Sequence, residues 1–180
     1  MNMKKIYPLL IALMLFLTSC SLGGVNMGIF NENNESIANN TFEQIVNAIK
    51  NQDKTMLEAL FSEKVRNEVI NFDVDATDFL NFIQEEIISF DDATKAGIGI
   101  DGDIEHGKKR KEIQSSFCVE TSEQKYYIAI RECTEDTFDR DNVGVKSIYI
   151  INANDWKEDY VYRGDGKWTL GINIVKESQA

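Results

Sequence analysis

The only histidine of the chain, His106, lies among carboxylates and is the first candidate for chemistry. Glu105 precedes it directly, and Asp101 and Asp103 are close by in the sequence. Imidazole groups titrate near neutral pH, so this one could act as a general base, or as a metal ligand together with the acids. A single histidine among carboxylates makes a poor zinc site, because such sites usually combine several histidine or cysteine ligands. We therefore expect no metal and no cofactor. Two alternatives stay open for His106, an exposed position and a place in a ligand pocket.

Two tyrosines and a tryptophan are the other candidates for a ligand site. Tyr126 and Tyr127 follow each other in a predicted strand and carry hydroxyls that can donate a proton. Trp156 lies in the polar stretch "NDWKED", where an exposed indole can contact a partner. No serine or cysteine has a recognisable base as its partner. We therefore predict no catalytic residue, and we predict ligand-binding positions at His106, Tyr126 and Trp156.

The stretch Leu17-Thr18-Ser19-Cys20 points to a different kind of chemistry, the attachment of lipid. It ends an apolar run that begins at residue 6, follows two lysines and is shorter than the ~20 residues of a membrane-spanning helix, as is typical of a signal peptide. An aliphatic residue, two small residues and a cysteine resemble the bacterial lipobox. The resemblance implies that the Cys20 sulfur takes a diacylglycerol and that residues 1–19 are removed as a signal peptide.

The lipid on Cys20 predicts the location of the protein and its first partner. Two or three acyl chains hold a protein on a membrane far better than one, so we expect an extracytoplasmic protein anchored to the outer face of the bacterial cell membrane. Loss of residues 1–19 removes two lysines and no acid, which changes the formal net charge from −11 to −13. Such a surface repels nucleic-acid phosphate. The basic run at residues 108–111 would alternate between the two faces of a strand, so we expect no nucleic-acid partner.

Composition divides the rest of the chain into a tether and a domain. Residues 20–39 are rich in glycine, asparagine and serine and have no sustained periodicity, which predicts a flexible tether after the lipidated cysteine. Residues 40–180 have the length of a single domain with one hydrophobic core.

Apolar residues at helical spacing predict three helices at the start of this domain. Asn40, Thr55 and Asp75 are placed to begin them, each with an acidic residue three positions later. The expected inward-facing residues are Phe42, Ile45, Val46 and Ile49 in the first helix, Met56, Leu57, Leu60 and Phe61 in the second, and Phe79, Phe82, Ile83 and Ile87 in the third.

From residue 97 onward, apolar and polar residues alternate, which predicts strands. Residues 106–133 form a long hairpin with its turn at Ser122-Glu123, residues 141–155 hold a further strand, and residues 160–174 form a last hairpin around Gly164-Asp165-Gly166. The glycine at 171 indicates a bulge in that hairpin. Three helices followed by long antiparallel strands predict an α+β fold, with the helices packed on one face of one strongly curved antiparallel sheet.

The register of the long hairpin argues against a disulfide between the two cysteines of the domain. A two-residue turn at Ser122-Glu123 places Cys118 opposite Tyr127 and Cys133 opposite Glu112. The two thiols would share a face of the sheet but lie about six residues apart along it, or roughly 20 Å. A disulfide needs Cα atoms within about 7 Å of each other. We therefore expect no disulfide.

Longer stretches of the domain resemble known families. "MLEALFSEKVRNE", "HGKKRKEI", "VETSEQKYYIAIRECTEDTFDRDNVG" and "YRGDGKWTLGINI" are similar to a family of Gram-positive lipoproteins known as domain of unknown function 5104. The similarity runs from about Asn40 to Val175. An amphipathic helix followed by "MLEALFS" also resembles the start of the nuclear transport factor 2-like superfamily, the cystatin-like cone. That resemblance implies a bent sheet that curls around the first helices and leaves a pocket at its wide end. The lipoprotein family brings no assigned activity, so no catalytic residue is carried over.

Two classes of function remain. The first is a lipid-anchored, non-catalytic binding module whose pocket or sheet holds a small molecule, a cell-wall fragment or another protein. The second, implied by the superfamily, is a small-molecule isomerase or dehydratase that sets a carboxylate base against a tyrosine or histidine in an apolar cavity. Its candidate residues would be Asp101, His106, Tyr126 and Tyr127.

Overall fold

A computed structural model of the chain describes residues 33–156 and 167–176, without the side chains at 94 and 96. The predicted signal peptide, the predicted lipidation at Cys20 and most of the predicted tether lie outside these residues. The first arm and the turn of the expected last hairpin lie outside them as well. No helix within the described ranges is long and apolar enough to cross a membrane.

Helix α2, Asn34–Asn51, packs through the face that the sequence predicts, since Phe42, Ile45, Val46 and Ile49 are all buried. It begins six residues before the expected start at Asn40. The side chain of Asn33 accepts a hydrogen bond from the Ser36 backbone N–H at 3.3 Å, which caps the helix at this earlier position. Residues 34–39, which we expected in the tether, are therefore helical.

The next helices are shorter and more numerous than expected. They are α3 (Lys54–Leu60), α4 (Glu63–Glu68), α5 (Phe72–Leu80) and the single turn α6 (Ala93–Ala96). The predicted second helix is divided in two because the Ser62 backbone N–H bonds to the Val145 carbonyl at 3.0 Å, outside any helix, and the Ser62 hydroxyl then caps α4. The predicted third helix ends at Leu80, and Ile87 lies in a strand instead.

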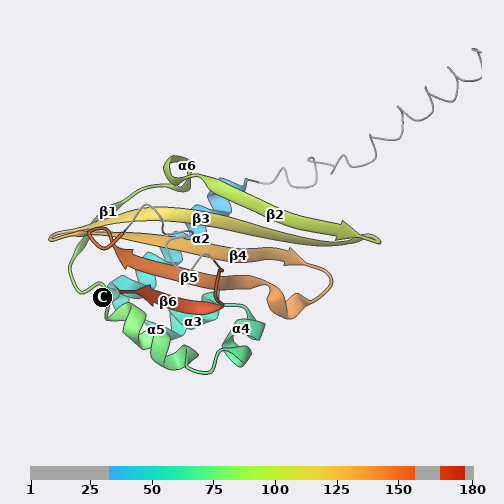
Figure 1. Ribbon diagram of the computed structural model, residues 1–180, viewed down its shortest axis with the longest axis horizontal. Coiled ribbons are helices and arrows are strands. Elements are labelled where there is room, and N and C mark those ends of the chain that lie inside the picture. Colours follow the sequence, from blue (N-terminus) through green and yellow to red (C-terminus); the bar gives the residue numbers. More distant parts are fainter. Residues whose placement is uncertain (1–32, 157–166, 177–180) are drawn as a thin grey trace, which may run out of the picture. The chain divides into compact units, whose positions relative to one another are not determined.

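Within the described residues, six strands form one sheet (Figure 1). They are β1 (Ile87–Phe90), β2 (Ile98–Glu105), β3 (Lys108–Thr121), β4 (Lys125–Asp136), β5 (Gly144–Asn152) and β6 (Gly171–Val175). The order across the sheet is β1-β3-β4-β5-β6, and β2 pairs with β3 beside the other end of that long strand. The strands β1 and β2 thus share one edge of the sheet.

The predicted antiparallel cone is wrong, because the sheet is mixed. Strand β6 runs parallel to β5, with Ser147 paired to Gly171 and Ile151 paired to Val175. A tight turn cannot join parallel strands, so β5 and β6 are not the two arms of a simple hairpin. The number of helices is also wrong, since five short-to-medium α-helices, rather than three, occur in the described part of the chain.

The predicted register of the long hairpin is confirmed over most of its length. From Glu112 to Glu120, each residue of β3 faces the predicted partner in β4, including Cys118 opposite Tyr127 and Glu112 opposite Cys133. Beyond Glu112 the register shifts by one residue, and Lys111 faces Glu135. Both cysteines are present as thiols.

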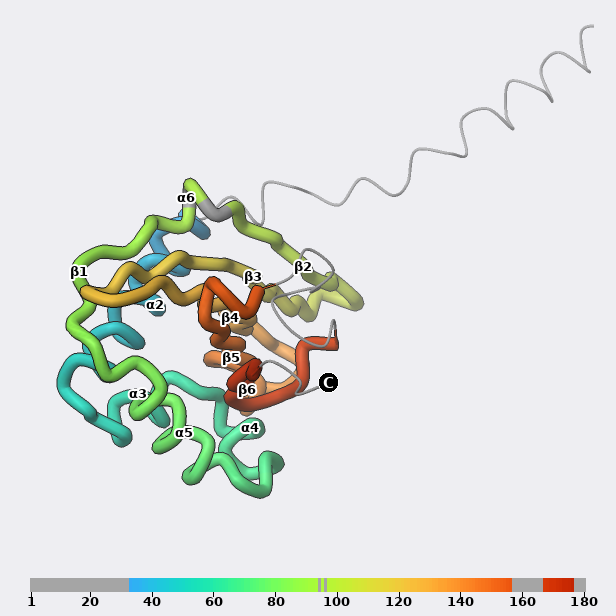
Figure 2. The backbone as a smooth tube through the Cα atoms, turned by 60° about the vertical axis from the view of Figure 1, so that its left-hand side comes forward, coloured from blue at the N-terminus to red at the C-terminus, as the bar shows by residue number. Residues whose placement is uncertain are grey.

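The helices cover one face of the sheet, called the inner face here, and they flank β6. Helix α2 lies across the strands, while α3, α4 and α5 gather beside β6 (Figures 1 and 2). The core forms between α2 and the inner face, where the Phe42 ring stacks on the Phe117 ring with centroids 3.9 Å apart. The opposite, outer face carries a second small cluster of Ala129, Tyr149 and Trp168.

Two glycines allow the close approaches that hold this arrangement together. Gly144, at the start of β5, has φ +126°, and a Cβ added there would lie 2.8 Å from the Ser62 backbone nitrogen. Gly171 begins β6 with φ +90°, and its added Cβ would lie 3.2 Å from the Val69 side chain. The predicted bulge at 171 is therefore a left-handed residue at which β6 packs against the segment between α4 and α5.

Candidate functional site

The alternation of apolar and polar residues places His106 on a strand face, but in the structure it lies in the two-residue turn between β2 and β3. Its φ is +51° and that of Gly107 is +79°, the positive values that a tight type I′ hairpin turn requires. The imidazole is 90% exposed, and its Nδ1 atom is 3.5 Å from the Glu105 carboxylate. Of the two alternatives, the structure thus places this side chain at the exposed position.

Tyr126 is buried on the inner face of β4, and its hydroxyl takes part in internal hydrogen bonds. The hydroxyl donates to Glu85 at 3.1 Å and accepts from the Gln124 side chain, which also donates to Glu85 at 3.0 Å. Burial, followed by the hydrogen bond with Glu85, raises the pKa of Tyr126 to about 12. These hydrogen bonds connect the loop before β1, which holds Glu85, with the turn between β3 and β4, which holds Gln124.

Trp156 lies on the other side of the sheet from Tyr126. Its ring packs edge-on against Tyr127 with centroids 5.9 Å apart, and Tyr127 alternates with Tyr126 to the outer face. The three predicted ligand-binding residues therefore occupy an exposed turn, the inner face and the outer face. The structure does not bring them together.

Glu132 is a buried carboxyl group on the inner face that the sequence reasoning missed. It is 6% exposed and follows Tyr126, Ile128 and Ile130 in the inward-facing row of β4. The Thr41 hydroxyl of α2 donates to its Oε2 atom at 2.8 Å, while its Oε1 atom is buried without a hydrogen-bond partner among the described residues. The sequence does hold a signal for this residue, because Glu132 continues the alternation of three inward-facing residues at every second position of the strand.

Burial determines the electrostatics of Glu132. Removal of the carboxyl group from water raises its pKa from 4.5 to about 7, and the hydrogen bond from Thr41 opposes this only in part. Ile113 of β3 and Val145 of β5 face it across the sheet. By strand alternation, Lys111 lies on the same face of β3, two residues from Ile113. Glu132 can thus gain or lose a proton near neutral pH within a largely apolar layer.

A second buried carboxylate, Glu112, lies on the outer face and is fully neutralised. Arg131 donates from Nε at 2.6 Å, and Lys146 donates from Nζ at 2.8 Å. Burial alone would raise the pKa of Glu112, but the hydrogen bonds and charges of Lys146 and Arg131 outweigh it and lower the pKa. This group therefore links β3 to β4 and β5.

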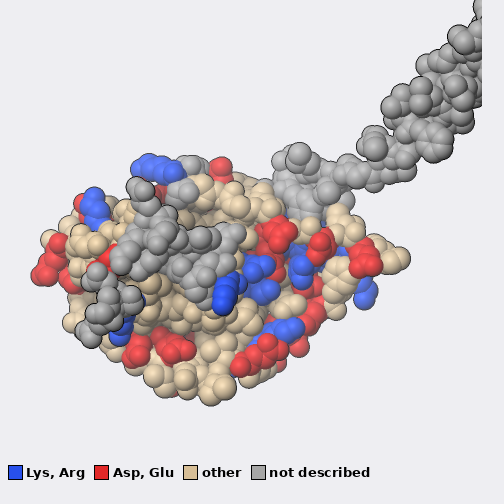
Figure 3. Space-filling view, viewed as in Figure 1, with Lys and Arg blue, Asp and Glu red and all other residues tan. Residues whose placement is uncertain are grey.

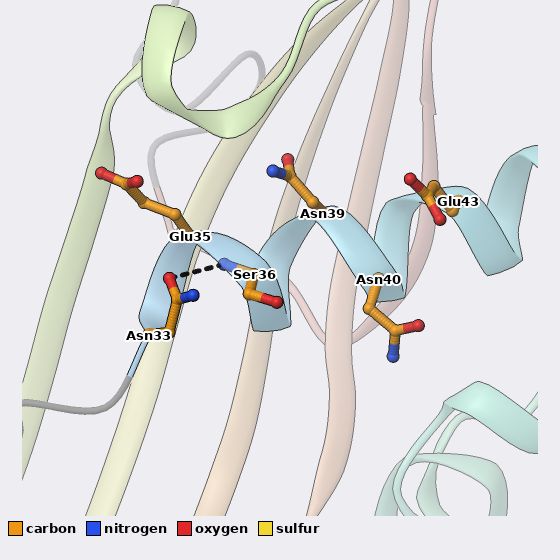
Figure 4. Close-up of a pocket in the computed structure, with 6 residues that line it drawn as sticks. All are labelled: Asn33, Glu35, Ser36, Asn39, Asn40 and Glu43. Atoms are coloured by element: carbon orange, nitrogen blue, oxygen red, sulfur yellow. Dashed lines mark hydrogen bonds between the residues drawn. The ribbon is translucent and has the colours of Figure 1, made fainter.

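One hollow of about 500 Å³ follows the exposed side of α2 near its start (Figure 4). Its lining consists of Asn33, Glu35, Ser36, Asn39, Asn40 and Glu43. Glu35, Asn39 and Glu43 point to one side of the helix while Asn33 and Asn40 point to the other, so these groups do not converge on a common point. The Asn39 side chain accepts a hydrogen bond from the Ala93 backbone N–H at 2.8 Å, which connects α2 with the start of α6.

A second hollow of about 630 Å³ lies where the β2–β3 turn meets the turn between β4 and β5. It is lined by Asp103, Ile104, Glu105, Arg110, Asp136, Phe138, Asp139 and Asn142. Asp136 holds this end together, since it accepts from the backbone N–H groups of Phe138 and Asp139 and from the Asn142 side chain. Acidic and basic side chains intermingle at this end of the sheet (Figure 3). Within the described ranges, no three His, Cys, Asp or Glu residues form a group that could hold a metal ion.

The long edge strand β2 leads into this hollow. All eight of its residues pair with β3, and no other described strand pairs with it. Among the described strands, none therefore bonds to the backbone groups of β2 that point away from β3. Ile100 and Ile104 are 49% and 45% exposed, which is unusual for aliphatic residues in a strand.

Comparison with known families adds one finding. The family model described as "Domain of unknown function (DUF5104)" matches residues 44–153, which run from within α2 past the end of β5 and include both Glu132 and β2. No curated protein matches the chain.

Proposed function

We propose that this chain, which belongs to the family described as Domain of unknown function (DUF5104), is a lipid-anchored protein that holds a protein partner along the open edge of β2, outside the cytoplasm. The anchor would be a diacylglycerol on Cys20, as the stretch Leu17-Thr18-Ser19-Cys20 indicates. The resemblance to Gram-positive lipoproteins supports this location. The further resemblance to the nuclear transport factor 2-like superfamily stays a prediction.

The observation that carries the binding role is the incomplete pairing of β2. An edge strand exposes a row of backbone donors and acceptors that can pair with an added strand, and proteins commonly blunt such edges with proline, bulges or short length. Strand β2 has eight residues, no proline and a regular register with β3. It also exposes two isoleucines, so the edge offers both hydrogen bonds and apolar surface to a partner.

Site-specific photo-crosslinking on the full chain in its membrane tests this function. A photoreactive amino acid is placed at Ile100 or Ile104 and, as a control, at Val74 in α5, which is an exposed aliphatic position away from the edge. We expect irradiation to give adducts of one defined mass from the two β2 positions and none from Val74. Adducts from Val74 at the same level, or none from β2, would contradict the proposal.

A small-molecule isomerase or dehydratase is the second candidate function, and Glu132 is the observation that favours it. A carboxyl group with a pKa near 7 in an apolar layer suits proton transfer to and from carbon. Tyr126 shares its face of β4 but lies six residues away, or roughly 20 Å, so the donor opposite the base would have to be another group.

Deuterium exchange tests this second function. Small cyclic ketones are incubated with the protein in heavy water, and deuterium incorporation next to the carbonyl is followed by mass spectrometry. Incorporation that is lost in Glu132→Gln would support the enzyme. Equal incorporation with both proteins, or none with either, would count against it.

A further inference from the structure

The open edge of β2 carries two chemically distinct rows of side chains. Asp101, Asp103 and Glu105 alternate to the outer face, whereas Ile98, Ile100 and Ile104 alternate to the inner face. A strand added beside β2 would place its own side chains next to both rows, about 5 Å away from their nearest neighbours. The chemistry of these rows therefore restricts the sequence that can pair there.

The strand that already pairs with β2 gives two examples of basic side chains beside its acids. On the outer face, Arg110 of β3 lies opposite Asp103 and donates to it at 2.5 Å, and Lys108 lies opposite Glu105. On the inner face, Ile113 lies opposite Ile100. On its paired side, the outer row of β2 thus faces two basic residues and, at Asp101, the acid Glu112. The inner row faces Ile113 at Ile100, Ser115 at Ile98 and Lys109 at Ile104.

The same rows disfavour a second copy of this chain as the occupant. If two β2 edges paired antiparallel about their centre, the three outer-face acids of one copy would lie beside those of the other. Like charges opposite each other on neighbouring strands are destabilising, and the net charge of −11 adds repulsion between copies.

We infer that the partner docks an extended segment in which lysine or arginine alternates with aliphatic residues, the basic residues on the outer face and the aliphatic ones on the inner face. This inference rests on the proposed function and adds to it the chemistry of the partner. The backbone of β2 provides the hydrogen bonds, while Asp101, Asp103 and Glu105 select basic side chains. Ile100 and Ile104 provide apolar contact on the other face.

Designed peptides test the chemistry of the segment directly. The probe is a fluorescein-labelled peptide with the sequence Lys-Val-Lys-Val-Lys-Val-Lys, and its binding to the full chain in non-ionic detergent micelles is followed by fluorescence anisotropy. One control replaces every lysine by glutamate, and another carries N-methyl groups on alternate backbone nitrogens. We expect both controls to bind at least tenfold more weakly than the probe. Equal binding of the acidic peptide overturns the charge match, and equal binding of the methylated peptide overturns strand addition.

A matched pair of variants tests whether the probe peptide binds along the β2 edge. Asp101→Lys changes the outer row, and Glu35→Lys makes the same change in net charge on the exposed side of α2. We expect about a fivefold loss of probe affinity in Asp101→Lys and none in Glu35→Lys, with thermal unfolding of both variants checking that the fold is kept. Equal losses would show that the peptide responds only to overall charge and would overturn the inference. Cross-links from Ile100 and Ile104 without any binding of the probe would overturn the partner chemistry and leave the proposed function standing.

Discussion

Glu132 occupies a position at which an apolar residue would fit the rest of its strand. A buried carboxylate without an opposite charge is costly, so the group is expected to hold its proton more tightly than an exposed glutamate does. Its two oxygens differ, since Oε2 accepts from Thr41 of α2 and Oε1 has no partner among the described residues. The contact between α2 and β4 therefore includes one side chain that titrates.

The free energy of unfolding should consequently decrease as the pH rises through the neutral range. The pKa of Glu132 is about 7 in the folded protein against 4.5 in the unfolded chain, so the folded state binds the extra proton. The stabilisation by this extra proton is complete below pH 4.5 and is lost as the pH rises to about 7. At 1.36 kcal/mol per pKa unit, the shift contributes about 3 kcal/mol to the free energy of unfolding at low pH. Urea unfolding between pH 4.5 and 8 measures it.

Glu132→Gln provides the control for this pH dependence. The amide keeps the shape of the side chain and can still accept from Thr41, but it cannot titrate, so the slope between pH 4.5 and 7 should disappear. Glu112 and Asp136, whose pKa values are lowered, contribute stability that is lost only at more acidic pH. The same slope in the glutamine variant would mean that another group is responsible.

At the scale of elements, α2 is the helix on which the inner face of the sheet depends. Its buried side chains contact the row that includes Phe117, and Thr41 reaches Glu132. This helix was predictable because four apolar residues at helical spacing are a local signal. The long hairpin was predictable for the same reason, since a two-residue turn determines which residues of β3 and β4 face each other.

Other elements could not be predicted from local patterns. Alternation of apolar residues marks β6 as a strand but is the same for parallel and antiparallel pairing, so its direction was assigned wrongly. The division of the second helix at Ser62 depends on a backbone bond to Val145, more than 80 residues away in sequence. At the candidate sites, alternation placed His106 on a strand, because the turn formed with Gly107 depends on positive φ angles.

A charge placed on the buried face of α2 should unfold the protein. Ile45 is fully buried, so Ile45→Asp would leave a carboxylate without a partner in the core, which costs several kcal/mol. Asn47→Asp adds the same side chain on the exposed side of the helix and should cost less than about 1 kcal/mol. Circular dichroism during urea unfolding measures both. Equally mild effects would show that α2 does not cover the sheet.

At the scale of the whole molecule, an acidic domain would be carried on a lipid. The formal charge of −11 opposes association with other copies and with anionic surfaces, so attachment to a membrane would have to come from another source than surface charge. The lipid predicted on Cys20 provides that source.

Cys20→Ser should abolish this attachment. Serine has no thiol to accept a diacylglycerol, so the variant should fail to incorporate labelled palmitate and should keep residues 1–19. Metabolic labelling and the intact mass of the protein measure these two effects. A variant that matures to the same size and stays equally bound to the membrane would disprove the lipid anchor.

The pairing of β6 with β5 has a consequence for the order of folding. Its five residues, 171–175, complete the sheet by pairing with β5 and by packing Gly171 against Val69, about a hundred residues earlier. Before β6 has been made, this contact is missing and β5 has an unpaired side. The sheet beside β5 therefore closes only after residues 171–175 have been made, later than all the other described strands.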